Sequence, residues 1–294
     1  MLDLSPREGR LLDSGRALLW EAAFGGRPGI ALADLPRGVD PAGCWLRAVV
    51  LGGQGWYAAA RAELIDVVRT TGDPALRSLA LSTEASLLRQ LGWHARASAL
   101  DGQALVQVAG SAREVSGDPL RAAAICDALT GLAADALGVG RPQVSARLLR
   151  RCRAEMDRAP VGMRALVRWH WVSAETALAA PGSGLIGEPA AVHAEAALAA
   201  AQEWGSIRHQ VKSRLLTAAA AAGAGDIDRS RARADQVNAQ CAEHELLPLR
   251  WAAAMLRSGV CESPAVRSAA AEADEYSRVL AGRGGRLRTA ADAG

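Results

Sequence analysis

Apolar residues return every three or four positions along most of this chain, and polar residues fill the positions between them. Val144, Leu148, Cys152 and Met156, for example, follow one another at intervals of four. This spacing places apolar side chains on one face of an α-helix. The alternation of polar residues with β-branched and aromatic ones that marks strands is nearly absent. The pattern therefore predicts an all-α protein.

About thirteen helices are predicted from this periodicity and from residues that start and stop helices. They cover residues 5–24, 41–53, 56–71, 74–90, 93–114, 119–137, 142–158, 161–179, 189–204, 206–222, 226–244, 247–258 and 264–281. The connections are mostly short, so successive helices are expected to pack antiparallel as hairpins. Residues 25–39 are predicted to form a turn-rich linker, residues 181–189 a longer loop, and residues 283–294 a flexible tail.

Three helix starts carry the same signature, Asp followed by Pro, at residues 40–41, 73–74 and 118–119. An aspartate at the N-cap accepts hydrogen bonds from amides of the first turn. Proline is favoured at the first helical position because its missing N–H has no partner there in any case. Each Asp-Pro pair therefore predicts the beginning of a helix.

The same signatures also recur at long intervals. The Asp-Pro pairs stand 33 and 45 residues apart, and two Gly-Trp pairs, at residues 55–56 and 92–93, stand 37 apart. Periods of this length are typical of stacked helical hairpins, each of which buries its apolar face against its neighbours. We therefore expect residues 1–282 to form a single domain, an α-solenoid in which residues 41–282 are the repeats.

Two units of this stack resemble the tetratricopeptide repeat. The matching small and aromatic positions are Ala48, Gly55, Tyr57 and Ala60 in the first unit, and Ala85, Gly92, His94 and Ala97 in the second. The chain departs from the pattern because no proline closes either unit, Asp101 replaces a late aromatic residue, and later units exceed 34 residues. The resemblance is clearest over residues 41–110. It implies a concave groove, lined by the first helix of each hairpin, that holds peptides, partner helices or small signals.

Carried over to this chain, the groove positions include Trp45, Ser82 and Arg89. Trp45 has a second interpretation, a core residue between hairpins, and Arg89 can equally be a solvated charge. A further candidate is the segment Trp169-His170-Trp171. Its two tryptophans cannot face one core, because residues two apart on a helix point in different directions. Trp171 flanked by Arg164 and Arg168 is therefore a second possible partner-binding site, since Trp and Arg dominate interface hot spots.

Composition narrows the classes of function. The chain has 294 residues, eight tryptophans, and 34 basic against 31 acidic residues, which is a mild excess for a protein that neutralises many phosphates. The five cysteines are scattered and odd in number, which favours free thiols in a reducing compartment. The N-terminus lacks the pattern of a signal peptide, and no apolar run is long enough for a membrane span. These features predict a soluble cytoplasmic protein.

Metal binding, catalysis and nucleic-acid binding find little support in the sequence. Cys241 and His244 share a helix face, but two ligands do not make a zinc site. Glu84, Asp127 and Glu175 lie on first helices of successive hairpins, where they more often recognise basic partners than catalyse. Motifs for nucleotide or metal-dependent catalysis are absent. Arginine clusters, such as the one at residues 147–153, have no base-stacking side chains at repeating positions, so nucleic acid is an unlikely partner.

The predicted function is a non-enzymatic adaptor or regulator that binds a protein or peptide in its groove, without a cofactor or metal. The first alternative is a ligand-sensing repeat module of a transcriptional regulatory system that acts in trans. The others are a nucleic-acid-binding helical repeat and an all-α enzyme. An adaptor requires a groove rich in exposed aromatic and charged residues, whereas a sensor requires a pocket between hairpins.

Overall fold

The computed structural model describes residues 14–109, 118–261 and 265–293, and within these ranges the chain forms thirteen α-helices, one short 3-10 segment (Ala290–Ala293) and no strand. The helices are α1 (Ser14–Phe24), α2 (Pro41–Gly53), α3 (Tyr57–Thr70), α4 (Pro74–Gln90), α5 (His94–Ala109), α6 (Pro119–Gly138), α7 (Pro142–Arg158), α8 (Met163–Ala179), α9 (Ala190–Trp204), α10 (Ile207–Gly223), α11 (Ile227–Glu243), α12 (Leu247–Val260) and α13 (Ala265–Gly282). The all-α prediction is confirmed. No described helix combines the length and apolar character needed to cross a membrane.

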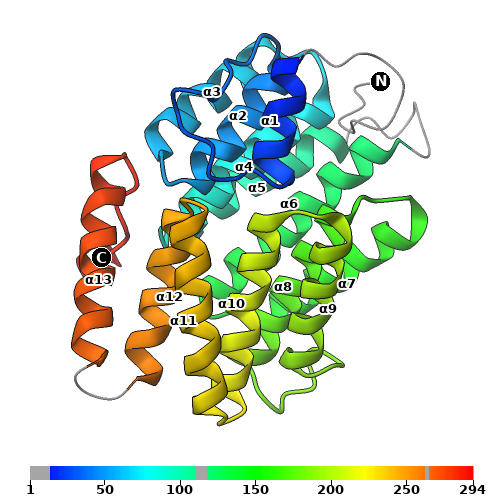
Figure 1. Ribbon diagram of the computed structural model, residues 1–294. Helices are drawn as coiled ribbons and strands as arrows, with labels where there is room; N and C mark the ends of the chain where they lie inside the picture. The colour runs from blue at the N-terminus through cyan, green and yellow to red at the C-terminus, as the bar shows by residue number, and fades with distance from the viewer. Residues whose placement is uncertain (1–13, 110–117, 262–264, 294) are drawn as a thin grey trace.

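Helices α2 to α13 form six antiparallel hairpins that stack in chain order (Figure 1). The pairs are α2–α3, α4–α5, α6–α7, α8–α9, α10–α11 and α12–α13. The first helix of each hairpin also packs against the first helix of the next one, from α2 through to α12. The even-numbered helices therefore form one continuous inner layer, and the solenoid-like architecture predicted from the repeat spacing is confirmed.

The three Asp-Pro signatures begin helices as predicted. Asp40 accepts a hydrogen bond from the Gly43 amide at 2.7 Å, and Asp118 accepts one from the Leu120 amide at 2.9 Å. Most predicted boundaries lie within a few residues of the observed ones, because caps and periodicity are local signals. The predicted helical residues 5–13 and 110–114 lie outside the described part of the chain.

Asp73 caps α4 with two hydrogen bonds, from the amides of Ala75 at 2.8 Å and Leu76 at 3.3 Å. Asp73→Ala is therefore expected to lower the free energy of unfolding by about 1 kcal/mol. Urea unfolding followed by circular dichroism measures the change. Asp66→Ala removes an exposed carboxylate that pairs with Arg69 on the surface of α3, and it is expected to cost less than about 0.5 kcal/mol. Equal losses in the two variants would contradict the capping role.

Small residues allow the helices of a hairpin to approach closely. Ala48, Ala60, Ala85 and Ala97, which occupy the small positions of the first two units, are fully buried between helices. A larger side chain at these positions has no space, since the interior is close-packed. The alanine-rich composition thus serves the packing of helix against helix.

The segment after α1, expected to be a linker, is packed against distant parts of the chain. The side-chain amide of Gln54 donates hydrogen bonds from Nε2 to the carbonyls of Pro28 at 3.0 Å and Ile30 at 2.8 Å. The Ile207 amide at the start of α10 donates to the Gly25 carbonyl at 3.2 Å, and α1 itself packs against α10. Helix α1 therefore bridges the first and fifth hairpins.

The C-terminal strap, which we define as residues 283–289, is also held in place, in contrast to the flexible tail expected there. The Ala58 amide donates to the Arg283 carbonyl at 3.0 Å, Trp93 Nε1 to the Arg286 carbonyl at 2.9 Å, and the Arg288 amide to the Leu91 carbonyl at 2.8 Å. A Cβ on Gly285 would lie 2.2 Å from the ring of Tyr57. The glycines suggested flexibility, but here glycine permits close backbone approach.

Candidate functional site

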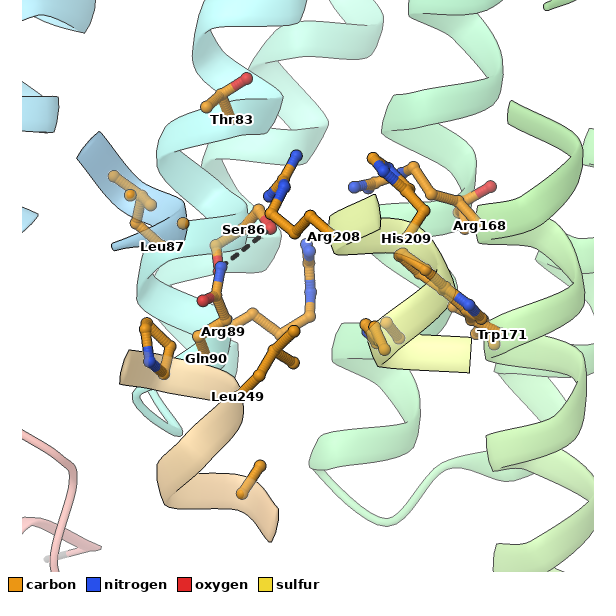
Figure 2. Close-up of a pocket in the computed structure, with 18 of the residues that line it drawn as sticks. Thr83, Ser86, Leu87, Arg89, Gln90, Arg168, Trp171, Arg208, His209 and Leu249 are labelled. Atoms are coloured by element: carbon orange, nitrogen blue, oxygen red, sulfur yellow. Dashed lines mark hydrogen bonds between the residues drawn. The ribbon is translucent and has the colours of Figure 1, made fainter. Parts of the chain in front are cut away.

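The inner helices line a cavity of about 490 Å³ that is partly open to solvent (Figure 2). Its walls come from all six inner helices, α2 to α12, with Phe24 of α1 and Leu280 of α13 closing parts of it. The volume lies within the roughly 300–1,000 Å³ typical of sites for small ligands. The lining combines leucine side chains with charged groups, and the charged groups distinguish this cavity from an ordinary packing defect.

Five of the six residues predicted to bind a partner line this cavity. They are Ser82, Arg89, Arg164, Arg168 and Trp171. The sequence suggested two separate sites, one from the repeat pattern and one from the Trp-Arg cluster. The structure brings both groups to the same cavity, because α4 and α8 are both inner helices and lie on either side of α6.

The sixth residue, Trp45, does not line the cavity. Its side chain is 1% exposed, and its Nε1 donates a hydrogen bond to Thr83 Oγ1 at 2.9 Å. Of the two interpretations of Trp45, the structure supports the core residue between the first two hairpins. A partner has no access to this ring.

Trp45 belongs to an aromatic cluster centred on Phe24, the C-terminal residue of α1. Ring centroids of Trp20, Trp45, Trp204 and His209 lie 5.2, 5.6, 5.7 and 6.2 Å from that of Phe24. These five rings come from α1, α2, α9 and α10. Edge-to-face and offset contacts at such distances stabilise aromatic pairs beyond the area that they bury. The cluster fixes α1 across the stack, and two of its members, Phe24 and His209, line the cavity.

Arg89 is enclosed by acidic residues. Its side chain is 14% exposed, its Nε lies 2.8 Å from Asp135 Oδ1, and its Nη2 contacts Asp101 Oδ2. Burial lowers the pKa of Arg89, but Asp101 and Asp135 offset this effect and the net shift is upward. Burial is also the main reason why the pKa of Asp101 rises to about 7, and Asp135 adds to the rise. Arg89 is therefore committed to two internal carboxylates, in contrast to the solvated charge considered above.

Arg164 and Arg168, one turn apart on α8, share Asp127 of α6. Arg164 Nη1 lies 2.6 Å from Asp127 Oδ2, and Arg168 Nε lies 3.2 Å from Asp127 Oδ1. The second contact lacks hydrogen-bond geometry, and neither of its atoms has another hydrogen-bond partner among the described residues. Burial lowers the pKa of Arg168, and Arg164 lowers it further, against the opposing effect of Asp127. Two cations thus share one carboxylate.

Trp171 forms a stacked arrangement with two residues of α10. The His209 ring is stacked on it at 5.2 Å, and Lys212 Nζ lies 4.3 Å from its centroid. Lys212 also lies 3.7 Å from Glu175 Oε1. Burial lowers the pKa of His209 well below its usual value, and the neighbouring Arg208 lowers it further, so this imidazole is neutral at pH 7. Neither His209 nor Lys212 stood out in the sequence.

Arg208 differs from the other cavity cations because no carboxylate of the described residues pairs with it. Its Nη2 donates a long hydrogen bond of 3.4 Å to the Ala23 carbonyl, and its buried Nε has no hydrogen-bond partner among the described residues. Burial lowers its pKa to about 10, and Arg168 and Arg164 contribute to the decrease. Figure 2 shows its side chain extending from α10 toward the α4 side of the cavity. The guanidinium remains charged at neutral pH.

The charges of the cavity and its first neighbours do not balance. Among the described residues there are five cations, Arg89, Arg164, Arg168, Arg208 and Lys212, and four acidic side chains, Asp101, Asp127, Asp135 and Glu175. A buried charge without a counter-charge is costly. The cavity therefore carries one more positive charge than its described acidic neighbours can neutralise.

Other residues singled out in the sequence lie elsewhere. Glu84 does not line the cavity, and its charged neighbours are Arg61 and Arg96. Trp169 donates from Nε1 to the Leu149 carbonyl of α7 at 3.0 Å, so the two tryptophans of its segment do face different neighbours. Within the described ranges, no group of three or more His, Cys, Asp and Glu residues is arranged to hold a metal ion, at Cys241 and His244 or anywhere else.

Comparison with models of known protein families found no match to this chain, and comparison with curated proteins found no significant similarity. The functional argument therefore depends on the cavity and its chemistry.

Proposed function

We propose that this protein is a non-enzymatic, ligand-binding regulatory module that takes a small molecule into the cavity between its inner helices. The observation that carries the proposal is the 490 Å³ cavity, which has both an apolar surface and charged groups that converge on it. Such a combination is the usual composition of a ligand site, in which apolar contacts give affinity and a few polar groups give orientation.

A small molecule suits this geometry better than the open peptide groove expected from the repeat resemblance. The groove features that an adaptor would present are used internally, since Trp45 is buried and Arg89 is bound to two carboxylates. Helix α1 also crosses the stack and places Phe24 in the cavity wall. The space that remains has the size of a small ligand.

A peptide adaptor is the second candidate function. The observation in its favour is that the cavity wall draws on every inner helix from α2 to α12, which provides a long surface for an extended chain. In this case the occupant would be a short end of a protein partner, since the volume allows only a few residues. Nucleic acid remains the least favoured partner.

Binding without catalysis is supported by the state of the carboxylates and of the histidine on α10. Asp127 is held by two arginines, and Glu175 lies beside Lys212. His209 shares a 2.8 Å hydrogen bond through Nδ1 with Ser206 Oγ and is stacked on Trp171. A general base needs a free acceptor near its substrate, and these groups are engaged with their neighbours.

We also propose that the repeats are tetratricopeptide-like. Support comes from the buried alanines at the small positions of the first two units, and from Gly55 and Gly92, whose φ angles of +84° and +83° suit a turn that favours glycine. A cytoplasmic location is proposed as well, and it is supported by the five cysteines, all of which are free.

The test is to fill the cavity. Ala252 lines it from α12, and Ala252→Trp is expected to occupy much of its volume. Ala232→Trp places the same side chain on an exposed site of the outer helix α11 and is the matched control. Each variant and the wild type are screened by thermal shift against a library of small metabolites and against a library of short peptides.

We expect a small molecule at 100 times its Kd to stabilise wild type and Ala232→Trp by about 2.7 kcal/mol, and Ala252→Trp hardly at all. Stabilisation by peptides alone, again lost in Ala252→Trp, would replace the sensor with the adaptor. Stabilisation that Ala252→Trp retains, or the absence of any stabilising compound, would overturn binding in this cavity.

A further inference from the structure

We infer that the cavity contains a subsite for an anionic group, centred on Arg208, and that its ligand is a small amphiphilic organic acid. The acidic group, a carboxylate or a phosphate monoester, would pair with Arg208, and an apolar body would lie against the leucines of the inner helices. This inference rests on the proposed function, because it names the chemistry of the ligand that the cavity holds.

The first argument concerns the unfilled hydrogen-bonding capacity of Arg208. A guanidinium offers five N–H donors in a planar fork that matches the two oxygens of a carboxylate or phosphate. Among the described residues, the internal acceptor that Arg208 contacts is a single carbonyl, that of Ala23, at the long distance of 3.4 Å from Nη2. Its Nε also lacks a hydrogen-bond partner in the described part of the chain, but it is buried and out of reach of a ligand in the cavity. An anion would therefore pair with the terminal Nη groups, whose donors are otherwise used by this one long hydrogen bond.

The second argument concerns electrostatic neighbours. Arg168 and Arg164 are close enough to lower the pKa of Arg208, and both line the same cavity. Asp127 neutralises one of these two arginines but not both. The region around Arg208 is therefore doubly cationic when empty, and a bound anion removes this repulsion. Every other cavity cation already has a carboxylate partner among the described residues.

The third argument is the shape of the remaining surface. Val49 and Leu87 on one side, and Leu215, Leu216 and Leu249 on the other, provide apolar lining from α2, α4, α10 and α12. In Figure 2, Arg168, Arg208 and His209 lie above Leu249 of α12, whereas Leu87 of α4 lies at about the height of Arg208. Apolar side chains thus line the cavity beside and below its charged groups, and an amphiphile can contact both kinds of lining at once.

The stem of Arg208 is positioned by the end of α2. A Cβ on Gly53 would lie 3.1 Å from Arg208 Cδ, so glycine at this position leaves room for the aliphatic part of the side chain. Gly53 itself lines the cavity. The C-terminal end of α2 thus packs against the stem of Arg208, which lines the cavity from α10.

The experiment compares ligands that share an eight-carbon body and differ in the head group. Octanoate, octyl phosphate, octanol and octylamine are titrated into wild type, Arg208→Gln, Arg208→Lys and Arg150→Gln, with calorimetry as the readout. Arg150 is exposed on the outer helix α7, so its variant removes one positive charge without touching the cavity. Circular dichroism confirms that each variant retains its helices.

We expect octanoate or octyl phosphate to bind wild type at least about tenfold more tightly than octanol, a difference of about 1.4 kcal/mol. Octylamine should bind more weakly than octanol. Arg208→Gln should abolish the preference for the acid, whereas Arg208→Lys and Arg150→Gln should keep most of it. The head group that binds more tightly, carboxylate or phosphate, identifies the natural class.

Three results would overturn the inference, and they differ in what they imply for the proposed function. Equal binding of octanol and the acids, lost in Ala252→Trp, would leave a ligand-binding cavity without an anion subsite. An acid preference that Arg208→Gln retains would likewise reject Arg208 as its centre. No binding by any of the four ligands would reject the amphiphile, and the library screen with Ala252→Trp would then decide whether the cavity takes another small molecule.

Discussion

Arg89→Gln is expected to lower the free energy of unfolding by about 3–5 kcal/mol, the largest effect of any single charge substitution in the cavity. Arg89 is held by Asp101 and Asp135, whose side chains are 0% and 1% exposed. Removing the cation leaves two acidic side chains in the interior without a counter-charge, and breaking a buried pair in this way costs about that amount. Urea unfolding at pH 7 followed by circular dichroism measures the change.

The same variant has a predicted pH dependence. In the folded wild type, the pKa of Asp101 is raised to about 7, above its ordinary value of about 3.9. Between these two values the folded state binds more protons than the unfolded state, so the free energy of unfolding falls as pH rises through this window. Loss of Arg89 removes the positive charge that lowers the pKa of Asp101. This pKa then rises further, so the pH window in which stability falls extends to higher pH. The loss in free energy of unfolding that Arg89→Gln causes, relative to wild type, should therefore be larger at pH 8 than at pH 5.

The matched control is Arg69→Gln. Arg69 pairs with Asp66 on the surface of α3, where both side chains are more than half exposed. An exposed pair of this kind contributes little, so the expected loss is below about 1 kcal/mol and nearly independent of pH. A loss from Arg89→Gln as small as that of the control, or a deficit that shrinks as pH rises, would show that Asp101 and Asp135 do not depend on Arg89.

The fold could be predicted from sequence where the signals are local. The N-caps Asp40, Asp73 and Asp118 and the three-to-four-residue periodicity depend on neighbours within one or two turns, and they located most helix boundaries within a few residues. Hairpin pairing followed from short connections. These features need no knowledge of how distant parts of the chain meet.

The cavity could be predicted only in part, because its remaining features depend on long-range contacts. The repeat pattern predicted Ser82 and Arg89 as site residues, and residue type predicted Trp171. Arg208 was not predicted, because its distinguishing property, that none of the described carboxylates pairs with it, depends on how distant helices pack. The strap was missed for a related reason: a Gly-Gly sequence signals flexibility unless the partner that requires close approach, here Tyr57, is known.

Phe24→Ala is expected to lower the free energy of unfolding by about 3–5 kcal/mol, the usual range for truncating a buried phenylalanine. The side chain is 3% exposed and has four aromatic neighbours within 6.2 Å, from α1, α2, α9 and α10. Its ring also lies 5.6 Å from the Arg164 guanidinium. Truncation leaves a cavity at the centre of this cluster and removes the contact that holds the end of α1 to α10. Urea unfolding measures the loss.

Fluorescence provides a local readout of the same change. Trp20, Trp45 and Trp204 all contact Phe24, so their emission should shift to longer wavelength in the folded variant as water reaches the cluster. Phe24→Leu keeps most of the apolar volume and should restore more than half of the lost stability. If Phe24→Ala unfolded with nearly wild-type stability and unchanged emission, α1 would be attached to the stack by other contacts. In that event the wall that Phe24 contributes would be dispensable, and the cavity would depend on the six hairpins alone.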